Sequence, residues 1–251
     1  MKTTFTLFGR IMKHITRSPD TIITVAITPI GIMLMFVYVF GGAIKASLPE
    51  GANYVNFQLP GILLMAIASG IAYTAFRMFG DKQRGIFARF NSMPISRSSA
   101  LWAHVLTSLV SNMVTVVIIF LIALLMGFRS SAGILQWLSV TGILALFTLS
   151  LTWVAVIPGL TARSAEGASM FSYPLIFLSL FSSAFVPTET MPAAVRWFAE
   201  NQPVTSIVEI VRALLNSDPV GNNIWVAIAW CIGILFVAWF FAMRAYRRRT
   251  V

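Results

Sequence analysis

The fold is decided by residues 58–128, which read QLPGILLMAIASGIAYTAF, then RMFGDKQRGIFARFNSMPISRSSA, then LWAHVLTSLVSNMVTVVIIFLIALLMGF. The two outer runs contain no Asp, Glu, Lys or Arg. The middle segment is basic and contains Arg77, Lys82, Arg84, Arg89 and Arg97. A helix needs about 20 apolar residues to cross the hydrocarbon core of a bilayer. The stretch therefore predicts two membrane spans joined by a basic segment at one membrane surface.

The composition of the whole chain agrees with a membrane protein. Of its 251 residues, 58% are hydrophobic and only 10% are charged, whereas soluble domains carry about 25% charged residues. The single cysteine, Cys231, excludes an internal disulfide. His14 and His104 lie far apart without other ligand-type residues nearby, which disfavours a metal site.

Six runs lack formal charges, so we expect an all-α integral membrane protein with six transmembrane helices. Residues 1–251 then form a single transmembrane domain. The first run is too long for the core of a cleavable signal peptide. The expected spans are residues 22–42, 58–76, 101–128, 134–160, 168–188 and 224–243.

The basic residues predict the orientation. Fourteen of the 18 Lys and Arg residues fall on the side of the basic segment and both termini, and four fall on the other side. Cytoplasmic segments carry the excess of Lys and Arg. We therefore expect a multi-pass protein of the cell membrane with both termini in the cytoplasm. The net charge of +10 is then a topology signal, and nucleic acid is not an expected partner.

Amphipathic helices are expected outside the spans. Phe5, Phe8, Met12 and Ile15 recur at spacings of three and four, which predicts an N-terminal interfacial helix. Before the last span, prolines favoured in a first turn predict a hairpin of two helices, Pro192–Glu200 and Pro203–Leu215. This hairpin could dip into the outer leaflet, cap a cavity or simply pack on the bundle. Glu209 and Arg212, three residues apart, are expected to pair.

Motifs for catalysis are missing from the sequence. No Gly-Lys dipeptide is present, so a phosphate-binding P-loop cannot form, and no H-E-x-x-H occurs. The eight acidic residues lie outside the spans or at their edges. An ion-coupled carrier usually keeps an ionisable group inside the bilayer, and these spans have none. We therefore predict a protein that is not an enzyme, binds no cofactor itself and takes its energy from a partner.

Polar residues within the spans form two stripes, one in residues 101–128 and one in residues 168–188, with Pro174 as an expected kink. Small and hydroxyl residues often mediate helix packing in lipid. The alternative is a weakly polar translocation path, with Asn112 as the residue most suited to it. The candidates for this path are Asn112, Ser111, Ser172, Ser179 and Ser183.

The basic segment also has two interpretations. From Asp81 to Pro94, DKQRGIFARFNSMP predicts a short helix with exposed aromatic and cationic residues, which could dock into a groove of another protein. Alternatively, it is an anchor that touches only lipid headgroups. On physical grounds alone, the two remain equally open.

The segment from Leu59 to Leu101 resembles the permease subunits of type-2 ABC exporters, in particular the daunorubicin/doxorubicin-resistance branch. It matches in Leu59-Pro60-Gly61, in the acid–basic–Gly–Ile–Phe–x–Arg–Phe pattern of residues 81–90, and in Met93-Pro94-Ile95-Ser96-Arg97. A second match, SSAFVPTETMPAAVRWFAENQPVTSIVEIVRALL, runs from Ser182 to Leu215. With the six spans, the resemblance covers nearly the whole chain.

The resemblance implies a dimer of permeases, each with an N-terminal interfacial helix, a cytoplasmic coupling helix and a short external helical hairpin before the last span. It implies that ATP and Mg²⁺ bind to a separate ATPase subunit. The residues implied to meet that subunit are Asp81, Arg84, Gly85, Phe87, Arg89, Phe90 and Pro94, with Glu166 as a second contact. The hairpin residues implied by the family pattern are Pro187, Glu189, Pro192, Asn201, Pro203, Glu209 and Arg212.

These expectations define the function predicted from sequence. The chain is expected to be the permease of a multidrug-type exporter of amphipathic or hydrophobic compounds, such as drugs, antibiotics or lipids, paired with itself or with a sibling permease. The alternatives are a secondary carrier or channel that works without an ATPase, and a non-transporting membrane scaffold.

Overall fold

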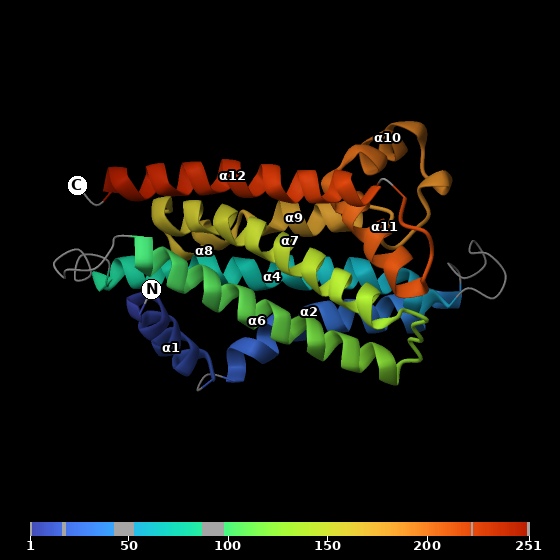
Figure 1. Ribbon diagram of the computed structural model, residues 1–251, viewed down its shortest axis with the longest axis horizontal. Helices are drawn as coiled ribbons and strands as arrows, with labels where there is room; N and C mark the ends of the chain where they lie inside the picture. Colours follow the sequence, from blue (N-terminus) through green and yellow to red (C-terminus); the bar gives the residue numbers. More distant parts are fainter. Residues whose placement is uncertain (1, 17–18, 43–52, 87–97, 222, 250–251) are drawn as a thin grey trace.

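The molecule is an elongated bundle of helices that run along one common direction (Figure 1). The structure, a computed structural model, describes residues 2–16, 19–42, 53–86, 98–221 and 223–249. Within these ranges four helices are long and apolar enough to cross a membrane: α4 (Tyr54–Gln83), α6 (Ser98–Leu125), α7 (Ile134–Thr161) and α12 (Asn223–Arg249). They match four of the expected spans. The expected count of six spans stays a prediction.

The first expected span falls on α2 (Pro19–Leu34), which continues into the π-helical turns η1 (Met35–Phe40). The N-terminal amphipathic segment is the helix α1 (Lys2–Thr16), which packs against α6. Its helical structure is confirmed, and its position at the membrane interface stays a prediction.

The fifth expected span, residues 168–188, differs from the prediction. It is interrupted, with α8 (Ala165–Ser169) and α9 (Ser172–Leu180) separated by a turn at Met170 and Phe171. Pro174 explains the break, because it has no N–H to donate to the Met170 carbonyl and its ring would collide with that carbonyl in a continuous helix. Proline is tolerated in a first helical turn, so α9 begins just before it.

The centre of the bundle is α4, which packs against α2, α6, α7, α8, α9 and α11. Glycines allow its closest contacts. A Cβ atom on Gly61 would collide with Ala184, and one on Gly70 would collide with Asn112 of α6. Small residues at such crossings are typical of helices packed in lipid, where close approach replaces the hydrophobic driving force.

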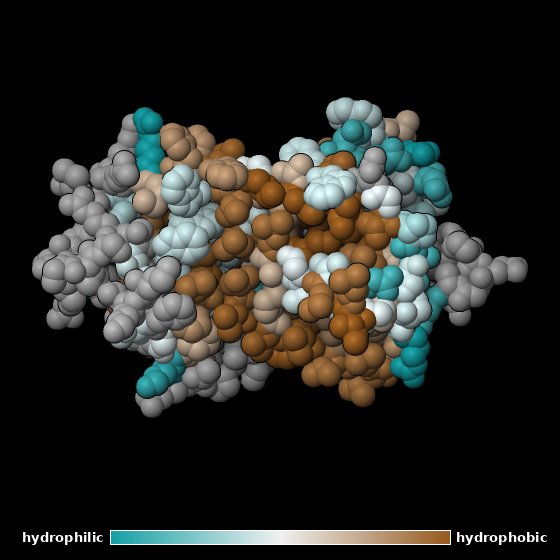
Figure 2. All heavy atoms as spheres, viewed as in Figure 1, coloured by the Kyte–Doolittle hydropathy of each residue, from teal (hydrophilic) through white to brown (hydrophobic). Residues whose placement is uncertain are grey.

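The ends of the bundle differ from its middle. Apolar side chains gather over the middle of the molecule, and hydrophilic ones lie toward the two ends (Figure 2). One end holds the last turn of α4, the start of α6, the α7–α8 corner and the end of α12 (Figure 1). We call it the basic end. The opposite end holds η2 (Thr188–Thr190), α10 (Ala193–Asn201) and α11 (Pro203–Asn216), and we call it the hairpin end.

Candidate functional site

At the basic end, two consecutive residues join α4 to two neighbouring helices. The Asp81 Oδ2 atom lies 3.2 Å from Nε2 of His104 on α6, and His104 is buried. The Lys82 Nζ group donates a hydrogen bond of 3.3 Å to the carbonyl oxygen of Ala162, just after α7. The end of α4 is therefore held firmly between α6 and α7.

The short helix expected from Asp81 to Pro94 differs from the structure at its start. Asp81 belongs to the last turn of the long helix α4, which ends at Gln83. Gly85 has a φ of 68°, and its N–H donates to the carbonyl of Lys82. Glycine is the residue that most easily takes this left-handed conformation and ends a helix. The chain is helical again at Ile86.

The residues predicted to contact the ATPase are only partly within the described ranges. Phe87, Arg89, Phe90 and Pro94 lie outside them. Arg84 is exposed at the end of α4. Glu166 is exposed in the first turn of α8, which is capped by Ser164 accepting the Gly167 N–H at 3.0 Å. Because α8 packs on α4, the structure brings Asp81, Arg84, Gly85 and Glu166 to the same end of the molecule.

The polar stripe of α6 faces its neighbours within the chain. Ser108 is the centre of a buried cluster. Its Oγ accepts a hydrogen bond from Thr74 Oγ1 of α4 at 2.8 Å and lies 3.2 Å from Thr152 Oγ1 of α7. The Asn112 Nδ2 group donates to the Ser108 carbonyl at 2.9 Å, while its Oδ1 is buried without a partner in the described part of the chain. This stripe therefore joins three spans, and Ser111 lies half-buried at its edge.

The second polar stripe lies on the other side of α4. Ser172 and Ser179 are buried and donate to carbonyls of Ser169 and Leu175, at 2.9 and 3.2 Å. Ser183 is buried, and its hydroxyl has no partner among the described residues. Because α4 packs against α6 and also against α9, it separates the two stripes. A role of either stripe in translocation stays a prediction.

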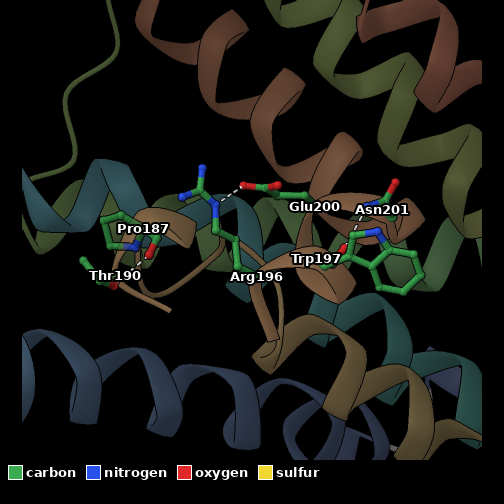
Figure 3. A network of polar contacts seen from close by, with 6 residues as sticks. All are labelled: Pro187, Thr190, Arg196, Trp197, Glu200 and Asn201. Atoms are coloured by element: carbon green, nitrogen blue, oxygen red, sulfur yellow. Dashed lines mark hydrogen bonds and ion pairs between the residues drawn. The ribbon is translucent and has the colours of Figure 1, made fainter. Parts of the chain in front are cut away.

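The helical hairpin is confirmed, with α10 and α11 within one or two residues of their expected bounds. Pro192 precedes the first residue of α10, and Pro203 is the first residue of α11. Figure 3 shows the polar contacts around α10. Arg196 Nε donates to Glu200 Oε1 at 2.7 Å, Asn201 Nδ2 to the Trp197 carbonyl at 2.8 Å, and Thr190 Oγ1 to the Pro187 carbonyl at 2.8 Å. Glu189 is exposed in η2.

Arg212 does not make the expected ion pair with Glu209 among the described contacts. Its Nε and Nη2 atoms donate to the Phe57 carbonyl of α4 at 3.1 and 3.0 Å, and Nη2 also donates to the Ser183 carbonyl at 2.7 Å. The guanidinium carbon lies 3.9 Å from the centre of the Phe57 ring. Burial lowers the pKa of Arg212 to about 10, so the group stays charged at neutral pH. We call this arrangement the Arg212 clamp.

Gln202 holds the hairpin at a second point and was not among the site residues predicted from sequence. This buried side chain lies between α10 and α11, and its Nε2 donates to the carbonyls of Leu178 and Phe181 at 3.0 and 2.9 Å. These carbonyls belong to the C-terminal end of α9, where helices leave acceptors unsatisfied. A polar residue directly before a proline-started helix was the only available signal.

The sequence is similar to those of known membrane transport proteins. Residues 2–216 match the model of the ABC-2 type transporter family. The chain is 30% identical to the daunorubicin resistance ABC transporter permease protein DrrB1 of Streptomyces coeruleorubidus, over 98% of this chain and 87% of that protein. It is 24% identical to the probable doxorubicin resistance ABC transporter permease protein DrrC of Mycobacterium tuberculosis, over 96% and 87%. It is 25% identical to the putative transport permease ycf38 of Cyanophora paradoxa, over 84% and 73%.

Proposed function

The chain belongs to the ABC-2 type transporter family, and from this membership we propose that it exports amphipathic or hydrophobic compounds from the cytoplasm or the inner leaflet. Permeases of this family are non-catalytic membrane subunits that work with a separate ATP-binding subunit. The observation that carries the proposal is the similarity to a daunorubicin resistance permease over 98% of this chain. Drugs, antibiotics or lipid-like molecules are the substrate class that this similarity supports.

The basic end is where the ATP-binding subunit docks in this proposal. That subunit holds ATP and Mg²⁺, and it contacts Asp81, Arg84, Gly85, Phe87, Arg89, Phe90 and Pro94, with Glu166 as a second contact. The contacts of Asp81 with His104 and of Lys82 with Ala162 support this placement. A force applied at Arg84 and Gly85 would reach α4, α6 and α7 together, because their ends are joined there.

In this proposal the polar stripes contribute to a translocation path that a second permease subunit, identical or related, completes. Within one chain, α4 separates Asn112 and Ser111 from Ser172, Ser179 and Ser183. The hairpin end lies on the outside, and the basic end and both termini lie in the cytoplasm. This orientation rests on the excess of basic residues at that end.

The test is a double variant, Arg84→Ala with Phe90→Ala, in complex with the ATP-binding subunit that co-purifies in mild detergent. We expect substrate-stimulated ATP hydrolysis to be lost while membrane insertion is unchanged. Arg196→Ala is the matched control, because this exposed arginine lies on α10 at the opposite end. Normal stimulation in the double variant would refute the docking site. Uphill transport in vesicles without nucleotide would favour a secondary carrier, and absence of any ATP-binding partner would favour a scaffold.

A further inference from the structure

A glutamine near the start of α4 lies in the core without a hydrogen-bond partner. Gln58 is fully buried, and neither its Nε2 nor its Oε1 atom makes a hydrogen bond within the described residues. The hydroxyl of Tyr54, one turn earlier on the same side of the helix, is also buried without a partner there. Unsatisfied polar groups in a core destabilise a fold, so a carboxamide in this state points to a ligand that satisfies it.

Gln58 faces the junction of α4 with two other segments. Gly61, three residues after Gln58, packs so closely on the segment after α9 that a Cβ atom on it would collide with Ala184. A Cβ atom on Gly41, which directly follows η1, would lie 3.6 Å from the ring of Tyr54, one turn before Gln58. Positions 54, 58 and 61 share one side of a helix. The Gln58 side chain therefore lies between η1 and the segment after α9.

Aromatic rings join these two segments. The rings of Phe36 in η1 and Phe185 stack with their centres 4.6 Å apart, and the centre of the Phe40 ring lies 5.6 Å from that of Phe36. Phe185 is buried, Phe36 is half-buried and Phe40 is exposed, so this row runs from the core to the surface of the bundle. The turns that carry Phe36 are π-helical, a rare geometry that is frequent at functional sites.

We propose that Gln58 binds a neutral hydrogen-bonding group of the exported compound, such as a hydroxyl, and that the Phe36 and Phe185 rings separate to admit it. The inference rests on the export function proposed above. Ser183, whose hydroxyl is buried without a partner in the described part of the chain, directly precedes Ala184 at this junction. The site therefore adjoins one residue of the predicted translocation path.

The chemistry of the side chain selects the ligand group. A carboxamide donates through Nε2 and accepts through Oε1, so one hydroxyl group can make both bonds with Gln58. The carboxamide carries no charge that would balance that of a buried ion. A neutral group on a largely apolar compound is therefore the ligand that fits. A compound without this group would leave the carboxamide unsatisfied and should bind less tightly.

The test measures binding apart from export. The complex with the ATP-binding subunit is placed in nanodiscs without nucleotide, and energy transfer from tryptophan reports binding of pyrenemethanol or methylpyrene, which differ by one hydroxyl group. Partition into protein-free nanodiscs is subtracted. We expect pyrenemethanol to bind about tenfold more tightly than methylpyrene, as for two neutral hydrogen bonds. Gln58→Leu should abolish this preference. The matched control is Gln136→Leu, since the Gln136 carboxamide already accepts from the Gly133 N–H, and it should keep the preference.

Stability separates a ligand site from a structural role. Replacing an unsatisfied polar group by an apolar one removes the cost of burying it, so Gln58→Leu should have a Tm equal to or above that of the parent. A lower Tm would assign the carboxamide a structural role and overturn the site. Equal binding of the two probes by the parent, or a preference retained in Gln58→Leu, would also overturn it, even where ATP-driven export is demonstrated. A preference that depends on Gln58 without export would refute the export function alone.

Opening of the aromatic pair is tested with Gln58→Cys. A membrane-permeant maleimide should label this thiol slowly without ATP and faster while ATP is hydrolysed. The parent protein is the control, because its only cysteine, Cys231, is buried. Labelling of the variant that stays as slow as that of the parent during ATP hydrolysis would overturn the entry of a ligand to Gln58.

Discussion

Replacing Arg212 by alanine tests whether the hairpin is held by backbone carbonyls or by an ion pair. The substitution removes the hydrogen bonds to the Phe57 and Ser183 carbonyls and the contact with the Phe57 ring. Leaving each carbonyl unsatisfied costs about 1 kcal/mol at the low end of the usual range. The ring contact adds about 1 kcal/mol for a partly desolvated site. The free energy of unfolding should therefore fall by about 3 kcal/mol.

The assay uses the buried thiol of Cys231, the only cysteine in the chain. Heating in detergent exposes this thiol on unfolding, and a thiol-reactive dye reports the transition. A loss of about 3 kcal/mol corresponds to a Tm lowered by roughly 6–12 °C in a chain of this size. Arg212→Lys keeps the charge but not the forked geometry, so it should restore only part of the loss.

Glu209→Gln separates the two explanations. If carbonyls hold Arg212, the half-buried Glu209 adds only an attraction without a hydrogen bond, so removing its charge should change the Tm by less than about 2 °C. Arg196→Ala, which breaks an exposed pair with Glu200 on the same hairpin, should also have little effect. A Glu209 variant as unstable as Arg212→Ala would mean that the ion pair holds the hairpin, and the clamp described here would be wrong.

Three further outcomes follow from the packing. Gly70→Leu should prevent stable folding, because the leucine side chain would displace Asn112 and separate α4 from α6. The control is Gly142→Leu, at a position with open space, and it should yield normal amounts of protein after purification. Gly85→Ala should lower the Tm by roughly 2–4 °C, because the left-handed conformation costs alanine about 1 kcal/mol. Gln202→Leu leaves two carbonyls at the end of α9 without their donor, so limited proteolysis should cleave between α9 and α11 at least about tenfold faster than in the parent protein.

Local signals in the sequence predicted the hairpin well. A proline in or just before the first turn and an apolar face of period 3.6 are properties of the segment itself, so α10 and α11 appear close to their expected bounds. The long uncharged runs likewise predicted α6 and α7. The presence of Pro174 predicted a distortion of the helix at that point. It did not predict that the helix would be interrupted by a turn at Met170 and Phe171 instead of being kinked.

The partners of individual side chains could not be predicted from the local sequence. The spacing of Glu209 and Arg212 suits an ion pair on an isolated helix, yet in the bundle the carbonyls of two other segments lie within reach of Arg212. The contact of Asp81 with His104 joins residues 23 positions apart in sequence. Both depend on how helices cross, which is set by close contacts such as that of Gly61 with Ala184.

The long helix α4 links these contacts physically. Its 30 residues span about 45 Å, which exceeds the hydrocarbon core of about 30 Å, so the helix is longer than a span needs to be. One end carries Asp81, in contact with His104, and the other carries the Phe57 carbonyl that Arg212 holds. Pro60 lies one turn from that carbonyl and removes one backbone hydrogen bond from the helix. A shift of the basic end of α4 would therefore be accommodated near Pro60, and the Arg212 clamp is the contact that such a shift would strain first.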